Sequence, residues 1–347
     1  MSRARIAIVD AGYRSYEVET RGAAEVGASI EVRQCRDEEE VAEFARDAVA
    51  VLARQSLLSR RVIERLERCR VIARYGTGVD NVDVEAATEH GIVVANVVGF
   101  GTHEVAEHAI ALLLAGARRI VSHDRAVRAG AWDIGPADPI GRITGSTLGL
   151  VGFGAIARAV QRKLSGFELR TLVYDPFVDD DLVRAAGATP VGLDELLREA
   201  DLVSLHAPLD RSTHHLLDAR ALALLKPGAV LVNTARGGLI DTVALVAALE
   251  QGRIAAAGLD VHEEEPLSPG HPIRSCERAI LLDHAGWYSE VSTRVLQQGA
   301  IDAAVAVLRG RRPASVVNPE AYARGLRASG SGEGRGPDTA ADGRGDG

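Results

Sequence analysis

Short apolar runs alternate with polar, helix-like segments along the first hundred residues of the chain. The apolar runs predict buried strands at residues 6–9, 29–33, 48–53, 71–74 and 92–95. The segments between them predict helices near residues 16–26, 38–46, 59–67 and 83–89. Strands that alternate with helices in this way are typical of a parallel sheet covered by helices on both faces.

The same alternation resumes after a long apolar stretch. Residues 102–121 predict one long helix that is apolar on more than one face. Further strands are predicted at residues 148–151, 169–174, 202–205, 229–232, 255–259 and 280–282. A final helix is expected over residues 290–308, and we expect it to return to the first sheet. The chain therefore contains two α/β units, and the first of them is discontinuous in sequence.

A glycine-rich turn follows the strand at 148–151. Gly152 permits a tight turn, and Gly154 carries no Cβ that would block a phosphate approaching the backbone. Ala157 stands where a third glycine is usual, and a second strand then ends at Asp175. A strand, a glycine-rich turn, a helix and an acid at this spacing form the dinucleotide-binding fingerprint, in which the helix N-terminus holds the pyrophosphate. Asp175 would bind the ribose and repel a 2′-phosphate, which favours NAD over NADP.

These patterns predict the fold class α/β, with two doubly wound parallel-sheet domains. A Rossmann NAD-binding domain at residues 98–287 is inserted into a flavodoxin-like substrate domain made of residues 1–97 and 288–321. Residues 322–347 are rich in Gly, Ser, Asp and Arg, and we expect a disordered tail there.

Composition excludes several kinds of partner. The net charge of −8 and the lack of a basic stripe argue against a nucleic-acid partner. The longest apolar run, residues 109–117, is too short to span a membrane. The three cysteines do not have the spacing of metal ligands, so we expect no metal site. Their small, odd number and the lack of a signal-peptide pattern predict a cytoplasmic protein. The apolar helix at 102–121 is either a buried core helix or part of a homodimer interface.

Three predicted strands are each followed by a polar residue that could carry chemistry. Arg236 follows the strand at 229–232, Glu265 lies in the acidic turn after 255–259, and His284 follows 280–282. Open α/β sheets place their ligands at the carboxyl ends of the strands. These residues therefore predict an anion clamp beside a Glu–His acid–base pair. Taken singly, each has a structural alternative, namely a surface ion pair, a solvated turn or a core histidine.

Several motifs together resemble the D-isomer-specific 2-hydroxyacid dehydrogenases, a family that includes phosphoglycerate dehydrogenase. The resemblance runs from about residue 48 to residue 319. It is carried by residues 74–81 (Arg-Tyr-Gly-Thr-Gly-Val-Asp-Asn), 149–157, 174–176, 206–209, 225–228, 233–238 and 259–266, and by His284. Residues 260–266 and 284–290 look most like the C-terminal-binding-protein branch.

The resemblance implies an NAD-dependent oxidoreductase that interconverts a small anionic 2-keto acid and its D-2-hydroxy acid. Arg236 would grip the carboxylate, His284 would exchange the proton, and Glu265 would orient His284. The implied substrate contacts are Arg74, Thr77, Gly78, Val79 and Trp287. The implied cofactor contacts are Gly152, Gly154, Ala155, Ile156, Asp175, His206, Ala207, Pro208, Thr213, Thr234, Ala235 and Asp260.

Some features leave alternatives open. Asp283 and Val98 stand where the family commonly has proline, and Asp283 could perturb the neighbouring His284. An NAD(H)-sensing, co-repressor-like interaction protein and a phosphite dehydrogenase-type enzyme remain alternative functions. Formate dehydrogenase is disfavoured because those relatives carry Gln where Glu265 stands. Arg54 is either a second anion contact or a surface residue.

Overall fold

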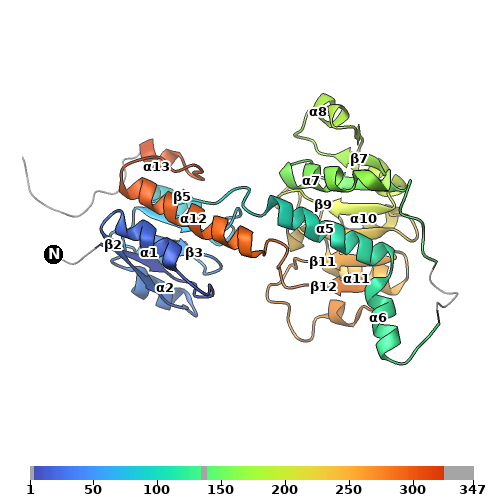
Figure 1. Ribbon diagram of the computed structural model, residues 1–347, viewed down its shortest axis with the longest axis horizontal. Helices are drawn as coiled ribbons and strands as arrows, with labels where there is room; N and C mark the ends of the chain where they lie inside the picture. The colour runs from blue at the N-terminus through green and yellow to red at the C-terminus, as the bar shows by residue number, and fades with distance from the viewer. Residues whose placement is uncertain (1–3, 134–138, 324–347) are drawn as a thin grey trace, which may run out of the picture. The chain divides into compact units, whose positions relative to one another are not determined.

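The computed structural model describes residues 4–133 and 139–323. The chain forms two compact units. The first consists of residues up to Phe100 together with residues from Thr293 onward, and the second is Gly101–Ser292. Each unit is a parallel β-sheet flanked by helices (Figure 1). The polarity pattern therefore predicted the fold class correctly.

The first unit contains a five-stranded sheet in the order β2-β1-β3-β4-β5. All of its pairings are parallel, and the order is that of flavodoxin-like folds. The strands are β1 (Ala4–Ile8), β2 (Ala28–Val32), β3 (Ala50–Ala53), β4 (Val71–Arg74) and β5 (Val93–Ala95). The helices are α1 (Glu17–Ala24), α2 (Glu38–Ala45), α3 (Arg60–Ile63), α4 (Val84–Glu89), most of α12 (Glu290–Leu308) and α13 (Glu320–Ala323).

The C-terminal part of the chain belongs structurally to this first unit. Helix α12 packs against α1 so closely that a Cβ on Gly22 would lie 2.5 Å from Cγ1 of Ile301. Gln297 of α12 donates to the carboxylate of the fully buried Glu19, which also accepts from the hydroxyl of Tyr75. Farther along, Asn318 accepts from the backbone N–H of Val94 on β5. Residues more than 200 positions away in sequence thus cover one face of the sheet and accept a hydrogen bond from its edge strand β5.

The second unit contains a seven-stranded parallel sheet in the order β12-β11-β10-β9-β6-β7-β8. Counted from β6, this is the Rossmann order 3-2-1-4-5-6 with one further strand. The strands are β6 (Thr147–Val151), β7 (Arg170–Tyr174), β8 (Thr189–Pro190), β9 (Leu202–Leu205), β10 (Val230–Asn233), β11 (Ala256–Leu259) and β12 (Ala279–Leu281). The α-helices are α5 (Thr102–Ala117), α6 (Ile120–Arg128), α7 (Ala155–Lys163), α8 (Asp180–Ala185), α9 (Leu193–Glu199), α10 (Ala219–Leu224) and α11 (Thr242–Glu250).

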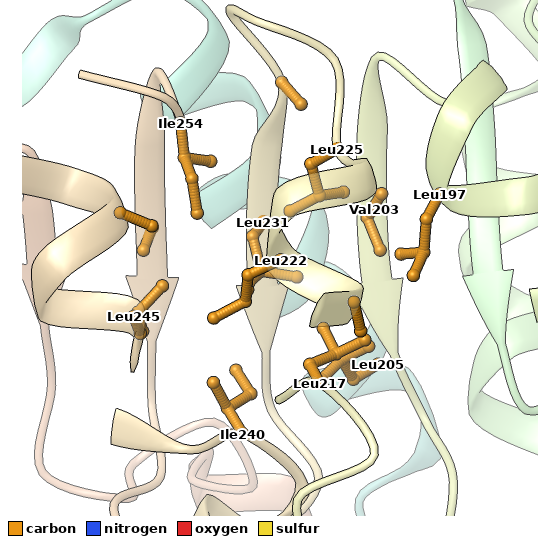
Figure 2. Packing of buried hydrophobic residues seen from close by; sticks show 14 of the residues in the cluster. Leu197, Val203, Leu205, Leu217, Leu222, Leu225, Leu231, Ile240, Leu245 and Ile254 are labelled. Atoms are coloured by element: carbon orange, nitrogen blue, oxygen red, sulfur yellow. The ribbon is translucent and has the colours of Figure 1, made fainter. Parts of the chain in front are cut away.

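Successive strand residues of this sheet face opposite apolar layers, which is why its strands read as unbroken apolar runs. Leu148 and Leu150 pack with α5 and α7, whereas Val151 packs with α9, α10 and α11. Figure 2 shows part of this second layer, where helix leucines meet strand side chains. The labelled residues include Leu197, Leu222 and Leu245 from the helices and Val203, Leu205 and Leu231 from the strands.

The long helix predicted over residues 102–121 is two helices. Helix α5 ends at Ala117, and Arg119 adopts a left-handed conformation with φ 53° before α6 begins at Ile120. The Arg119 guanidinium bonds to the carbonyl oxygen of Ala255, which anchors the turn to the sheet. The prediction of one helix was wrong because the apolar pattern continues through a turn that a tertiary contact stabilises.

The remaining differences are small. The short strand β8 was not predicted, and α3 is shorter than the predicted helix at 59–67. The tail was predicted to begin at residue 322, but residues 322 and 323 belong to α13. The rest of the predicted tail, from residue 324 onward, lies outside the described residues. Among the helices that the structure describes, none is long and apolar enough to cross a membrane.

Candidate active site

The glycine-rich turn after β6 has the geometry that a dinucleotide pyrophosphate requires. Gly152 has φ 88°, and a Cβ there would lie 2.8 Å from the backbone nitrogen of Ala207. Gly154 is the N-cap of α7, and a Cβ on it would meet no atom within 4 Å. At Gly152, close backbone packing and the positive φ therefore require glycine. Gly154 instead borders open space at the helix N-terminus, which Ala155 and Ile156 form. A phosphate fits such a position because the N–H groups and the helix dipole favour an anion.

Asp175 lies directly after β7, beside the same turn. One carboxylate oxygen accepts from the backbone N–H of Phe153 at 2.8 Å, and the other accepts from that of Phe177 at 2.9 Å. Asp175 therefore holds the glycine-rich turn in place, a role that the sequence did not predict. Because a carboxylate oxygen has two lone pairs, these bonds leave acceptor capacity for the predicted ribose contact.

Two predicted cofactor residues at the ends of β9 and β10 carry polar atoms that lack a partner within the described residues. Nε2 of His206 and Oγ1 of Thr234 are both buried there without a hydrogen bond. Burial lowers the pKa of His206 to about 4, so the ring is neutral at physiological pH. Buried polar atoms are nearly always paired, and a bound polar group is one explanation for such orphans. These two atoms fit the amide and hydroxyl groups of a nicotinamide nucleotide.

The other predicted contacts near these strand ends are parts of the loops. The hydroxyl of Thr213 donates to the carbonyl oxygen of Pro208 at 2.7 Å and stabilises the loop after His206 and Ala207. The backbone N–H of Ala235 donates to the side chain of Asn233. In this structure the Thr213 hydroxyl therefore stabilises its own loop.

His284 and Glu265 form a hydrogen-bonded pair. Nδ1 of His284 lies 2.8 Å from Oε2 of Glu265, and both side chains are partly exposed. Burial alone would raise the pKa of Glu265, but the bonds from His284 and from the backbone N–H of His262 outweigh it and lower the pKa. Glu265 is therefore ionised at neutral pH and fixes the ring with its Nδ1 side toward the carboxylate. Nε2 is left as the nitrogen that can exchange a proton with a ligand.

Asp260 holds the loop that carries His284. Its carboxylate, 2% exposed, accepts from the backbone N–H groups of Ala285 and Gly286, and its carbonyl accepts from the N–H of His284. Burial alone would raise the pKa of Asp260, but His108 at 3.1 Å and these N–H groups lower it. These bonds give Asp260 a positioning role, and its predicted contact with the cofactor stays a prediction.

Arg236 follows β10 on a loop that packs against the Glu265 loop. The guanidinium bonds to the carbonyl oxygen of Ala235 at 2.7 Å, and the Arg236 carbonyl accepts from Asn233. The next residue, Gly237, is so close to His262 that a Cβ would lie 1.9 Å from its carbonyl carbon. The second unit therefore brings the three predicted catalytic residues onto adjoining loops at the carboxyl ends of β10, β11 and β12.

The predicted substrate contacts Arg74, Thr77, Gly78 and Val79 lie in the first unit, where Arg74 is the last residue of β4 and the other three follow it in the next loop. The Arg74 guanidinium occupies the space above Gly76, where a Cβ would lie 1.2 Å from Nη1. The backbone N–H groups of Thr77, Gly78 and Val79 bond to no other residue that the structure describes. Successive free N–H groups next to an arginine suit an anion.

Trp287 and Asp283 flank His284 in sequence. Trp287 is partly buried, and its ring stacks edge-on against Tyr288 at 5.7 Å. Asp283 is exposed, and within the described part of the chain its carboxylate makes no hydrogen bond or ion pair with His284. Among the described residues, no direct contact links Asp283 to the His284–Glu265 pair.

Sequence reasoning missed His108 and His262. His108 lies on α5, more than 150 residues from Asp260, and no spacing rule connects them. His262 bonds to the carbonyl oxygen of Leu282 through Nε2 and to Glu265 through its backbone. Nothing in the sequence signalled either bond, because one involves the backbone of His262 and the other joins two loops through its imidazole.

Comparisons with known proteins identify similar chains. Residues 110–286 match the family model described as "D-isomer specific 2-hydroxyacid dehydrogenase, NAD binding domain". A glyoxylate reductase from Korarchaeum cryptofilum is 38% identical, over 88% of this chain and 94% of the relative. A D-3-phosphoglycerate dehydrogenase from Methanocaldococcus jannaschii is also 38% identical, over 85% of this chain but 56% of the relative.

Solved structures give the same result. A crystal structure of a glyoxylate reductase from Paecilomyes thermophila matches with a TM-score of 0.81 and 29% identity, covering 92% of this chain and 99% of that one. The likeness to the C-terminal-binding-protein branch stays a prediction. The chain belongs to the D-isomer-specific 2-hydroxyacid dehydrogenases, and its second unit is the NAD-binding domain of that family.

Proposed function

We propose that this NAD-dependent dehydrogenase reversibly reduces a small 2-keto acid to the D-2-hydroxy acid, with His284 as the acid–base residue. The observation that carries the proposal is the 2.8 Å bond between His284 and an ionised Glu265, beside the Arg236 loop. When bound, the reduced nicotinamide supplies the hydride. His284 gives a proton to the keto oxygen through Nε2, and Glu265 holds the ring by its Nδ1 in the orientation that this transfer needs.

Arg236 binds the carboxylate of the substrate in this proposal. A guanidinium presents two parallel N–H groups to a carboxylate, which fixes both the position and the plane of the acid. The resemblance to the family assigns further substrate contacts to Trp287 and, in the first unit, to Arg74 and the backbone N–H groups at residues 77–79. Glyoxylate is the first substrate to test, because the relatives compared above include enzymes named glyoxylate reductase.

Arg54 bears on the size of the substrate. It lies after β3 in the first unit, and its Nε is buried without a partner among the described residues. Its Nη2 is 3.1 Å from the position of a Cβ on Gly12, so this glycine leaves room for the guanidinium. Arg54 is therefore a candidate contact for a second anionic group, such as a phosphate or second carboxylate, and the phosphorylated analogues in the panel below test it.

The decisive experiment is NADH consumption with a panel of 2-keto acids, run on the wild type and on Arg236→Lys. The panel contains glyoxylate, pyruvate, hydroxypyruvate and phosphorylated and phosphonate analogues, and phosphite is tested with NAD in the oxidative direction. Because a point charge cannot reproduce the guanidinium fork, Arg236→Lys should lose about 100-fold or more in kcat/KM and retain NADH affinity. Near-wild-type kinetics in that variant would remove Arg236 from the site.

The same panel separates the alternatives. Tight NADH binding without turnover of any acid supports the NAD(H)-sensing alternative, and turnover of phosphite alone supports the phosphite alternative. Repeating the panel with NADPH tests Asp175, whose charge disfavours a 2′-phosphate. A preference for NADPH would contradict the proposed use of NAD.

We propose a homodimer whose interface includes α6. Helix α5 buries Ala106, Ala109, Leu112, Leu113 and Gly116 within the second unit, whereas α6 buries none of its residues. Ile120, Val127 and Trp132 are 55%, 51% and 89% exposed. Such side chains gain stability when a partner covers them. Sedimentation should give a dimer at micromolar concentration, and Ile120→Glu with Val127→Glu should shift it toward monomer, whereas a monomeric wild type would contradict the proposal.

A further inference from the structure

A second histidine–glutamate cluster lies in the NAD-binding unit, apart from the catalytic pair. It consists of His214 and His215, in the loop after β9, and Glu263, in the loop after β11. One ligand atom from each of the three side chains lies within 4.8 Å of the other two. Nε2 of His215 is 2.6 Å from Oε1 of Glu263, and the two imidazole rings stack with centroids 4.0 Å apart.

The three side chains differ in how firmly they are held. Glu263 is fixed from two sides, because its other oxygen accepts from the backbone N–H of Thr242 at the start of α11. Burial alone would raise its pKa, but the bonds from Thr242 and His215 lower it, so the carboxylate is ionised at neutral pH. His214 is exposed, and its imidazole makes no hydrogen bond with the described residues. The cluster thus combines the anchored, negatively charged carboxylate of Glu263 with an imidazole, that of His214, whose nitrogens are available to a ligand.

His215 is held in an unfavourable conformation. Its φ is 52°, in the left-handed region that residues with a Cβ seldom adopt. The backbone N–H of His215 donates to the carbonyl oxygen of Gly238, which keeps this conformation in place. Strained residues of this kind concentrate at ligand sites. Here the conformation directs His215 toward Glu263.

We propose that His214, His215 and Glu263 bind a divalent transition metal ion, with Zn²⁺ as the reference ion. Two imidazoles and one carboxylate form a donor set that zinc uses with water in the fourth position, whereas Mg²⁺ and Ca²⁺ prefer oxygen ligands. Ligand atoms on tetrahedral zinc lie about 3.3 Å apart, given bonds of about 2.0–2.1 Å. Small rotations of the exposed His214 and of His215 bring the three atoms to that spacing.

The position of the cluster suggests what the ion does. His215 is bonded to Gly238, two residues from Arg236, and Glu263 is two residues from Glu265. A bound ion would cross-link the loops that carry two of the proposed catalytic residues. Because the ion binds the folded protein preferentially, it should also stabilise it.

The test is equilibrium dialysis of the chelator-treated full-length protein against Zn²⁺, followed by metal analysis. We expect one zinc ion per chain. His214→Ala and Glu263→Gln should each weaken binding by about tenfold or more, since each removes one ligand. Glu263→Gln keeps the side-chain shape and an acceptor for the Thr242 N–H, so it is expected to fold. Zinc should raise Tm by roughly 5 °C in the wild type and less in both variants.

Two controls exclude other locations. His103→Ala removes an exposed histidine of α5, and Glu265→Gln alters the catalytic pair. Both variants should bind zinc as the wild type does. The proposal is overturned if no zinc binds, if His214→Ala and Glu263→Gln bind it normally, or if Glu265→Gln is the variant that loses it. Because binding is measured directly, none of these results depends on dehydrogenase activity.

Discussion

Two histidine–glutamate pairs lie in the NAD-binding unit and share several features, although His284 meets its glutamate through Nδ1 and His215 through Nε2. His284 and Glu265 are 2.8 Å apart, and His215 and Glu263 are 2.6 Å apart. Both histidines have a left-handed backbone, with φ values of 59° and 52°. In both pairs the glutamate also accepts from a backbone N–H, and its pKa is lowered.

The surroundings of the two pairs differ. The His284 loop is clamped by the buried carboxylate of Asp260, and Arg236 lies on the adjoining loop. His215 instead has a second imidazole stacked on it. A hydrogen-bonded His–Glu pair is therefore compatible with acid–base chemistry or with metal binding, and the neighbouring groups decide which. Comparing matched substitutions in the two pairs tests this distinction.

The largest difference is expected when each histidine is replaced by glutamine. His284→Gln removes the proposed proton donor and should lower kcat for keto-acid reduction by about 100-fold or more. His215→Gln should lower it less than fivefold in metal-free enzyme. Stopped-flow or steady-state measurement of NADH oxidation checks both variants. Equal losses would mean that the two histidines are not functionally distinct.

A smaller difference is expected between the glutamine variants of the two glutamates. Glu265 bonds to Nδ1 of the proposed proton donor His284, whereas Glu263 bonds to His215, which has no part in the proposed reaction. Glu265→Gln keeps the shape of the side chain but removes its charge, so it should lower kcat for keto-acid reduction by roughly tenfold. Glu263→Gln should leave kcat of the metal-free enzyme close to that of the wild type. The measurement is steady-state NADH oxidation at saturating keto acid, and an unchanged kcat in Glu265→Gln would show that Glu265 does not orient His284.

The smallest effect concerns stability and should be the same in both pairs. The pKa of each glutamate is lower in the folded protein than the ordinary value of about 4.3. Each charge therefore contributes stability above that value, and the contribution disappears as the pH falls through the lower, folded pKa. At pH 7, Glu265→Gln and Glu263→Gln should each reduce the free energy of unfolding by up to about 1 kcal/mol, since both pairs are partly solvated. Urea unfolding at pH 7 and near pH 4 measures the loss, which should shrink at the lower pH, and a loss that grows there contradicts this assignment.

The local sequence pattern predicted most of the fold. The apolar runs marked the strands because a parallel sheet buries both of its faces, as Leu150 and Val151 show by packing on opposite sides. The glycine-rich turn was recognisable because Gly152 requires a positive φ and a close backbone approach. The break at Arg119 was not, because a carbonyl group more than 130 residues away stabilises it.

By itself, the sequence determined the alternation of strands and helices, the dinucleotide turn and the residue types at the strand ends, because these depend on neighbours a few positions apart. Only the tertiary structure decided which partners those residues meet. It brought His108 to the carboxylate of Asp260, bonded that carboxylate to the loop after His284, and placed His214 and His215 beside Glu263. The physical reason is that parallel strands far apart in the chain end at one edge of the sheet. The loops that meet there therefore form contacts that sequence spacing does not encode.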